Sequence, residues 1–125
     1  MRARARAVVA IVDDDPRILE SLTDLLESAG YEVHAYSSGV SLLASGASDI
    51  DCLITDIGMP AMDGFELRDR VKLERPELPV FLISGRRDLS QRNVDRQGDT
   101  EVFPKPFDGP TLLAAIGNAL HTASD

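Results

Sequence analysis

Short strand-like segments recur along the chain, and most of them end beside a polar or charged residue. The clearest is the run of Ala, Val and Ile at residues 7–12, which stops at Asp13. Apolar runs of this length, rich in β-branched residues, are typical of strands buried on both faces of a parallel sheet. Four further strands are predicted at residues 31–36, 50–55, 79–83 and 101–103.

The segments between these strands carry helical periodicity and helical start and stop signals. Asp15 and Pro16 predict an N-cap followed by proline at the first helical position, and Gly30 predicts the end of that helix. Asp63 precedes Gly64 at the predicted start of another helix. The predicted helices cover residues 16–29, 38–44, 64–75 and 110–120.

Strands that alternate with helices predict an α/β fold: a doubly wound, five-stranded parallel sheet with helices on both faces, CheY-like or flavodoxin-like. A fourth helix should lie between the last two strands, but residues 86–98 contain only Leu89 and Val94 as aliphatic residues. We therefore expect that helix to be weak or irregular. The length of 125 residues predicts a single domain over residues 1–125, with no output domain after it.

Polar residues follow or end four of the predicted strands: Asp13 and Asp14, Asp56, Ser84 and Lys105. Sites in parallel sheets form outside the carboxyl ends of the strands, so we expect these side chains to converge. Taken singly, each aspartate could equally be a helix cap or a turn residue. Three carboxylates brought together repel one another unless a cation joins them, and oxygen ligands favour Mg²⁺ or Mn²⁺. Beside a metal, a hydroxyl and an ammonium group, Asp56 would be equipped as a nucleophile toward phosphorus.

Charge and composition restrict the function further. The net charge of −8 argues against nucleic-acid binding by this domain alone, because phosphate binding needs a basic surface. No apolar run approaches the roughly 20 residues that span a bilayer, so we expect no membrane association. The single cysteine, Cys52, falls inside a predicted strand, and the absence of a disulfide framework predicts a cytoplasmic location.

Four short motifs, in this order and at these separations, resemble the receiver domain of response regulators, the CheY-like superfamily, and the middle of the chain is similar to the FixJ-like branch. The resemblance covers about residues 8–120. The motifs are Ile11-Val12-Asp13-Asp14-Asp15-Pro16, Asp56-Ile57-Gly58-Met59-Pro60-Ala61-Met62-Asp63-Gly64, Ile83-Ser84-Gly85 and Lys105-Pro106-Phe107.

The resemblance implies a magnesium site and a phosphorylation site. Asp14 would bind Mg²⁺ directly and Asp13 largely through water, with Asp56 and the Gly58 carbonyl as further ligands. Asp56 would be the phosphoacceptor.

The phosphoryl donor would be a sensor histidine kinase or a histidine phosphotransfer protein. Ser84 would be the switch hydroxyl, Lys105 would pair with the phosphoryl group, and the peptide between Lys105 and Pro106 would be cis. The chain would then be a signalling domain that assists its own phosphotransfer and autodephosphorylation rather than an enzyme. It would act on a downstream effector or output domain, as a monomer or as a phosphorylation-dependent dimer.

One departure from the family pattern keeps a second hypothesis open. Receiver domains usually carry Tyr, Phe or His three residues before the lysine, where this chain has Val102, with Phe103 one residue later. Successive strand residues point to opposite faces, so Phe103 should not replace the missing ring. The alternative function is a degenerate receiver that acts as a non-phosphorylated interaction scaffold. An aspartyl-phosphate phosphatase is disfavoured, because such enzymes carry a second acid two residues after the nucleophile and this chain has Gly58 there. A flavodoxin-like nucleotide binder is disfavoured, because no Gly-rich loop follows the first strand.

Overall fold

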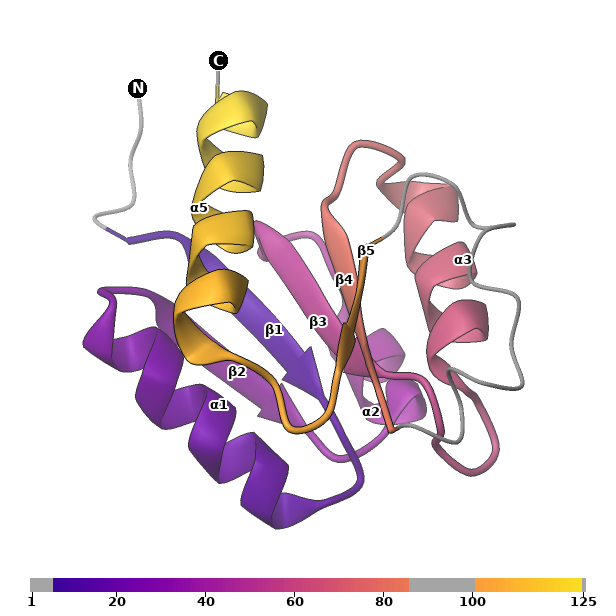
Figure 1. Cartoon of the computed structure of the whole chain (residues 1–125). Coiled ribbons are helices and arrows are strands. Elements are labelled where there is room, and N and C mark those ends of the chain that lie inside the picture. Colours follow the sequence, from indigo (N-terminus) through magenta and orange to yellow (C-terminus); the bar gives the residue numbers. More distant parts are fainter. Residues whose placement is uncertain (1–5, 86–100, 125) are drawn as a thin grey trace.

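A five-stranded parallel sheet forms the centre of the protein (Figure 1). The structure, a computed structural model, describes residues 6–85 and 101–124. The strands are ordered β2-β1-β3-β4-β5, which places the first strand of the chain between the second and the third. Their bounds are β1 Val8–Val12, β2 Glu32–Tyr36, β3 Cys52–Asp56, β4 Val80–Ser84 and β5 Glu101–Pro104.

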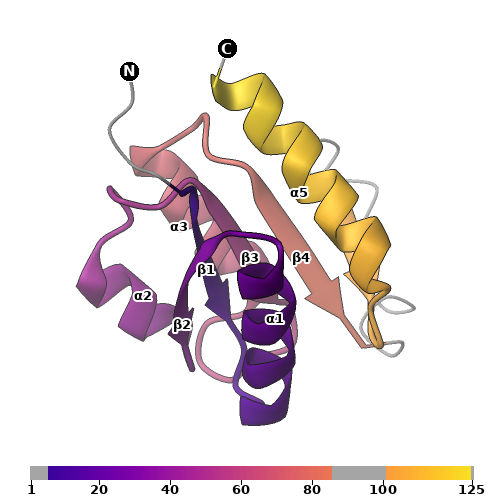
Figure 2. The same cartoon turned by 90° about the vertical axis from the view of Figure 1, so that its left-hand side faces the viewer.

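The described helices cover both faces of this sheet. Helices α1 and α5 lie on one face, and α2 and α3 lie on the other (Figure 2). This arrangement confirms the predicted doubly wound α/β fold. The predicted weak fourth helix, at residues 86–98, lies outside the described residues. The helix bounds are α1 Pro16–Ser28, α2 Gly39–Ser45, α3 Gly64–Glu74 and α5 Gly109–Ser124.

The predicted helix boundaries have the expected physical causes. The side chain of Asp15 caps α1 by accepting the N–H of Arg17 at 2.9 Å, and the side chain of Asp63 caps α3 by accepting the N–H of Glu66 at 2.9 Å. After α1, Gly30 has a φ of +96°, in the left-handed region that favours glycine. Both caps begin helices whose first turns lie next to strand ends, so they help to fix the loops at the carboxyl edge of the sheet.

Alternate residues of each strand contribute to two separate hydrophobic cores. On β3, Leu53 belongs to the core under α2 and α3, whereas Ile54 belongs to the core under α1 and α5. All five residues of β3 are buried, as expected for a central strand of a parallel sheet. Both faces are thus closed by apolar packing, and polar side chains are displayed where the strands end.

The same alternation shows whether Phe103 can take the place of the aromatic residue that is missing at Val102. Val102 packs against the core under α2 and α3, and Phe103 packs against the opposite core, where its ring meets that of Phe81 edge-on at 6.0 Å between centroids. Phe103 therefore does not occupy the position of the missing aromatic residue, as the sequence predicted.

No helix within residues 6–85 and 101–124 combines the length and the apolar character needed to cross a membrane.

Candidate functional site

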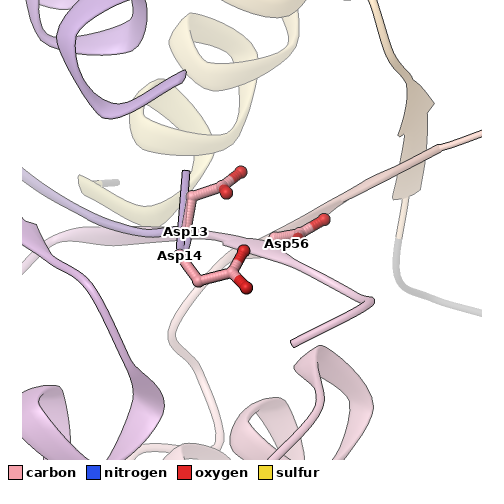
Figure 3. Close-up of side chains that lie close together, drawn as sticks. All are labelled: Asp13, Asp14 and Asp56. Carbon is pink, nitrogen blue, oxygen red and sulfur yellow. The ribbon is translucent and has the colours of Figure 1, made fainter. Parts of the chain in front are cut away.

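Three aspartates meet at the carboxyl edge of the sheet, as the strand-end rule predicted. Asp13 and Asp14 follow β1, and Asp56 is the last residue of β3. One carboxylate oxygen from each lies within 4.8 Å of the others, and Figure 3 shows the three side chains gathered at one place. β1 and β3 are adjacent and parallel, with Val12 paired to Thr55, so Asp13 and Asp56, each one residue further along, lie at the same level of the sheet edge.

Lys105 brings a positive charge into this group of carboxylates. It follows β5 directly, and its Nζ lies 3.1 Å from both Asp13 Oδ2 and Asp56 Oδ1. Burial alone would lower the pKa of Lys105, but Asp56 and Asp13 together raise it above its ordinary value. The ammonium group is therefore held charged between two carboxylates that come from different strands.

Burial raises the pKa of Asp13 and of Asp56 above the ordinary carboxyl value. A hydrogen bond from the N–H of Asp15 and the charge of Lys105 oppose this rise for Asp13. The charge of Lys105 also opposes it for Asp56. The side chains are 1% and 5% exposed, so water solvates neither carboxylate well. The ionised forms of both groups therefore depend on neighbouring positive charge.

The donor set fits a divalent cation that prefers oxygen. Asp13 Oδ1 accepts the N–H of Asp15 at 2.9 Å, whereas Asp13 Oδ2 is buried and accepts no well-aligned hydrogen bond from the described residues, with only the Lys105 ammonium paired to it. Asp14 is exposed, so it offers its carboxylate to the same place from the solvent side. A small hard cation would satisfy the buried oxygen and reduce the repulsion among the three acids.

The loop from β3 to α3 is closely packed against the strand end. The N–H of Ile57 donates to Ile83 O at 2.9 Å, and the N–H of Gly64 donates to Ile57 O at 3.0 Å. A Cβ atom at Gly64 would lie 2.5 Å from Asp56 O, far inside normal contact. Sequence reasoning read Gly64 only as part of the helix start and missed this contact, which depends on how α3 sits on β3.

The remaining predicted site residues lie at the same edge. Ser84 ends β4, is fully buried and donates from its Oγ to Gly85 O at 2.9 Å. The N–H of Lys105 donates to Ser84 O at 2.8 Å, which fixes the end of β4 beside that of β5. The peptide between Lys105 and Pro106 is cis, as expected. A backbone hydrogen bond from Gly58 lowers the pKa of Asp56, while a metal-ligand role for the Gly58 carbonyl stays a prediction.

Fold and site together define a class of protein: a doubly wound α/β domain with an acidic, oxygen-only cluster and a paired lysine at the carboxyl edge of its sheet. The family model for the response regulator receiver domain matches residues 9–117. The chain therefore belongs to the response regulator receiver domain family of two-component systems.

Individual relatives agree with this assignment. The chain is 36% identical over 119 residues to the response regulator protein TodT of Pseudomonas putida and 35% identical over 116 residues to the DNA-binding transcriptional regulator NtrC of Rhizobium meliloti. Those matches cover 94% and 91% of this chain but only 52% and 24% of the relatives, so the chain spans about half or less of their length. A receiver domain protein from Clostridium thermocellum superposes with a TM-score of 0.84 at 29% identity, covering 94% of this chain and 97% of that one.

Proposed function

We propose that this chain is a phosphoryl-accepting receiver domain in which Asp56 takes a phosphoryl group from a phosphohistidine. The donor would be a sensor histidine kinase or a histidine phosphotransfer protein. The observation that carries this proposal is the position of Lys105 Nζ, 3.1 Å from both Asp56 Oδ1 and Asp13 Oδ2, inside a cluster of three carboxylates. A carboxylate held beside a fixed cation has both the nucleophile and the charge that phosphoryl transfer requires.

The transfer step balances with groups of the donor and of this chain. An Asp56 carboxylate oxygen attacks phosphorus, and the new O–P bond forms as the P–N bond to the donor imidazole breaks. The electron pair of the broken bond stays on the imidazole nitrogen, which takes up a proton from water. Lys105 stays charged throughout, because its pKa is raised, and it pairs with a phosphoryl oxygen.

A divalent cation, Mg²⁺ or Mn²⁺, would be held by Asp13, Asp14, Asp56 and the Gly58 carbonyl. When bound, it would neutralise charge that develops on the phosphoryl oxygens. The chain's own contribution is to hold Asp13 in place through the N–H of Asp15, at 2.9 Å, and to keep Asp56 largely out of water. The buried Asp13 Oδ2, which accepts no well-aligned hydrogen bond from the described residues, supports this ligand set.

Ser84 would then act as the switch hydroxyl. Its Oγ donates to Gly85 O in this structure, and it would turn to a phosphoryl oxygen once Asp56 is phosphorylated. That exchange would alter the end of β4 and, through the N–H of Lys105 on Ser84 O, the start of the segment after β5. A downstream effector, an output domain or a second phosphorylated copy would recognise the altered surface.

Incubation with acetyl phosphate and Mg²⁺, followed by intact-mass measurement, tests the proposed function. The native protein should gain the mass of one phosphoryl group, and Asp56→Asn should gain none. Asp63→Asn is the matched control, because it removes a nearby carboxylate while asparagine still caps α3. An unmodified native protein, or an equal adduct on Asp56→Asn, would refute the assignment and favour the non-phosphorylated scaffold.

Magnesium should stabilise the folded protein, and Asp14→Asn should weaken that effect. A ligand that binds only the native state contributes about 2.7 kcal/mol at a concentration 100 times its Kd. A tenfold weaker Kd in Asp14→Asn would remove about 1.4 kcal/mol of this contribution when the ion is near saturation. Because Asp14 is exposed, its loss should change the metal-free stability by only about 0.5 kcal/mol or less.

Thermal unfolding with and without millimolar Mg²⁺ measures this difference. Asp24→Asn, on the exposed side of α1, serves as the control and should respond to Mg²⁺ as the native protein does. Equal Mg²⁺ responses in Asp14→Asn and Asp24→Asn would show that Asp14 is not a ligand.

A further inference from the structure

Thr55, next to the proposed phosphoacceptor, is a buried hydroxyl that the proposed reaction does not use. It lies in β3, is fully buried, and pairs across the sheet with Val12 on one side and Leu82 on the other, both of them almost completely buried. Valine would fill the same volume without a polar group, and burying a hydroxyl is unfavourable unless it finds a hydrogen-bond partner. The partner of Thr55 therefore indicates what the hydroxyl does.

That partner is the carbonyl of the acceptor itself. Thr55 Oγ1 donates to Asp56 O at 3.1 Å. The other end of the same peptide group, the N–H of Ile57, donates to Ile83 O at 2.9 Å. Gly64 presses on this peptide from α3, since a Cβ there would lie 2.5 Å from Asp56 O. The peptide that follows Asp56 is thus held at its oxygen by Thr55 and at its nitrogen by β4.

We propose that Thr55 is a positioning residue that fixes the peptide between Asp56 and Ile57 and thereby the direction of the Asp56 carboxylate. Rotation of this peptide changes the ψ angle of Asp56, and its side chain would move relative to Lys105 Nζ, which lies 3.1 Å from Asp56 Oδ1. Phosphoryl transfer depends on such alignment, because a small misplacement of reacting groups lowers the rate strongly. The inference rests on the proposed function of Asp56 as the acceptor.

The comparison with Ser84 separates this role from that of the switch hydroxyl. Ser84 Oγ also donates to the carbonyl of the next residue, Gly85 O at 2.9 Å. Gly85 is partly exposed, and a Cβ added to it would meet no atom of residues 6–85 and 101–124 within 4 Å, whereas Asp56 O is enclosed by Thr55 and Gly64. Ser84 Oγ thus bonds to the carbonyl of a partly exposed loop residue, whereas the Thr55 hydroxyl bonds to a carbonyl that α3 encloses.

Two substitutions at residue 55 distinguish a positioning role from core packing. If Thr55 positions the peptide, Thr55→Val should slow phosphorylation more than Thr55→Ser does. If Thr55 only fills the core, Thr55→Ser should be the more harmful substitution. Thr55→Val keeps the volume and removes the hydroxyl, so it should lower the rate constant for phosphorylation by acetyl phosphate about three- to tenfold, the effect of one net hydrogen bond. Thr55→Ser keeps the hydroxyl and loses a methyl group, so it should phosphorylate at about the native rate while unfolding more easily. Ile54→Val, which removes a methyl group from the opposite face of β3, is the packing control and should leave the rate unchanged.

Hydrogen exchange of the Ile57 amide, measured by NMR on the metal-free proteins, provides a readout that needs no phosphorylation. We expect Ile57 to exchange about tenfold faster relative to the other β3 amides in Thr55→Val, and to keep its native rate relative to those amides in Thr55→Ser. The proposal would be overturned if Thr55→Val kept both the native phosphorylation rate and the native exchange of the Ile57 amide. It would also be overturned if Thr55→Ser changed these two rates as much as Thr55→Val does. If the native protein accepts no phosphoryl group, the proposed function fails, but the exchange of Ile57 still decides whether Thr55 fixes the acceptor peptide.

Discussion

Gly64→Ala should lower the free energy of unfolding by about 2–3 kcal/mol, the usual effect of forcing an extra carbon into a closely packed site. The added Cβ would lie 2.5 Å from Asp56 O, 2.9 Å from Ile57 Cα and 3.0 Å from Asp56 C. All three are backbone atoms, so no flexible side chain can turn away. Either the first turn of α3 or the acceptor peptide must move.

Both ways of relieving this contact act on the site. A shift of α3 breaks the hydrogen bond from the N–H of Gly64 to Ile57 O, and a shift of the acceptor peptide displaces the Asp56 carboxylate from Lys105. We therefore expect slower phosphorylation together with the loss of stability, whichever part of the structure moves.

Urea unfolding monitored by circular dichroism measures the effect. Gly85→Ala is the matched control, because a Cβ there meets no atom within 4 Å in the part of the chain that the structure describes, and the residue lies outside the left-handed region. The stability of this variant should change by only about 0.5 kcal/mol or less. Equal stabilities for Gly64→Ala and Gly85→Ala would mean that the start of α3 does not lie in close contact with the peptide between Asp56 and Ile57.

The sequence was sufficient to predict which residues meet, because that prediction needs only strand order and strand ends. Asp13, Asp56 and Lys105 each end or follow a strand of one parallel sheet, and parallel strands present their carboxyl ends at one edge. The opposite faces of Val102 and Phe103 followed from the two-residue period of a strand in the same way. These are properties of single elements, and a sequence pattern carries them directly.

The unequal environments of those residues could not be predicted, because they depend on contacts between elements. Asp13 and Asp14 are neighbours in the sequence, yet Asp13 is buried and accepts the N–H of Asp15 while Asp14 is exposed. In the sequence Thr55 is only the last residue of a predicted strand; its hydrogen bond to Asp56 O appears only once the end of β3 is built. Likewise, the contact of Gly64 with that carbonyl requires α3 to be packed in place.

Lys105→Met should destabilise the metal-free protein at neutral pH by about 2 kcal/mol. The substitution leaves Asp13 and Asp56, 1% and 5% exposed, without the ammonium group 3.1 Å away from each. Removing one partner of a well-buried ion pair costs about 3–5 kcal/mol, and the partial exposure of the lysine reduces the expected effect here. Added Mg²⁺ should restore part of the loss, because a bound cation replaces the missing charge.

The loss should shrink as the pH falls from 7.5 to 5. Burial already raises the pKa of Asp13 and of Asp56, and Lys105 opposes that rise, so both pKa values should be higher still in Lys105→Met. On acidification, the folded variant then takes up protons before the unfolded chain does, and its stability increases. Lys105 itself remains charged throughout this range, because its own pKa is raised.

Denaturant unfolding at pH 5 and 7.5, with and without Mg²⁺, measures both trends. Lys72→Met, in the last turn of α3, controls for the loss of one positive charge away from the site and should show little dependence on either variable. A difference between native protein and Lys105→Met that is the same at both pH values would mean that the two buried carboxylates do not depend on Lys105 for their charge. In that case the lysine would serve only the incoming phosphoryl group, and Asp13 and Asp56 would have to be stabilised by the backbone N–H groups of Asp15 and Gly58.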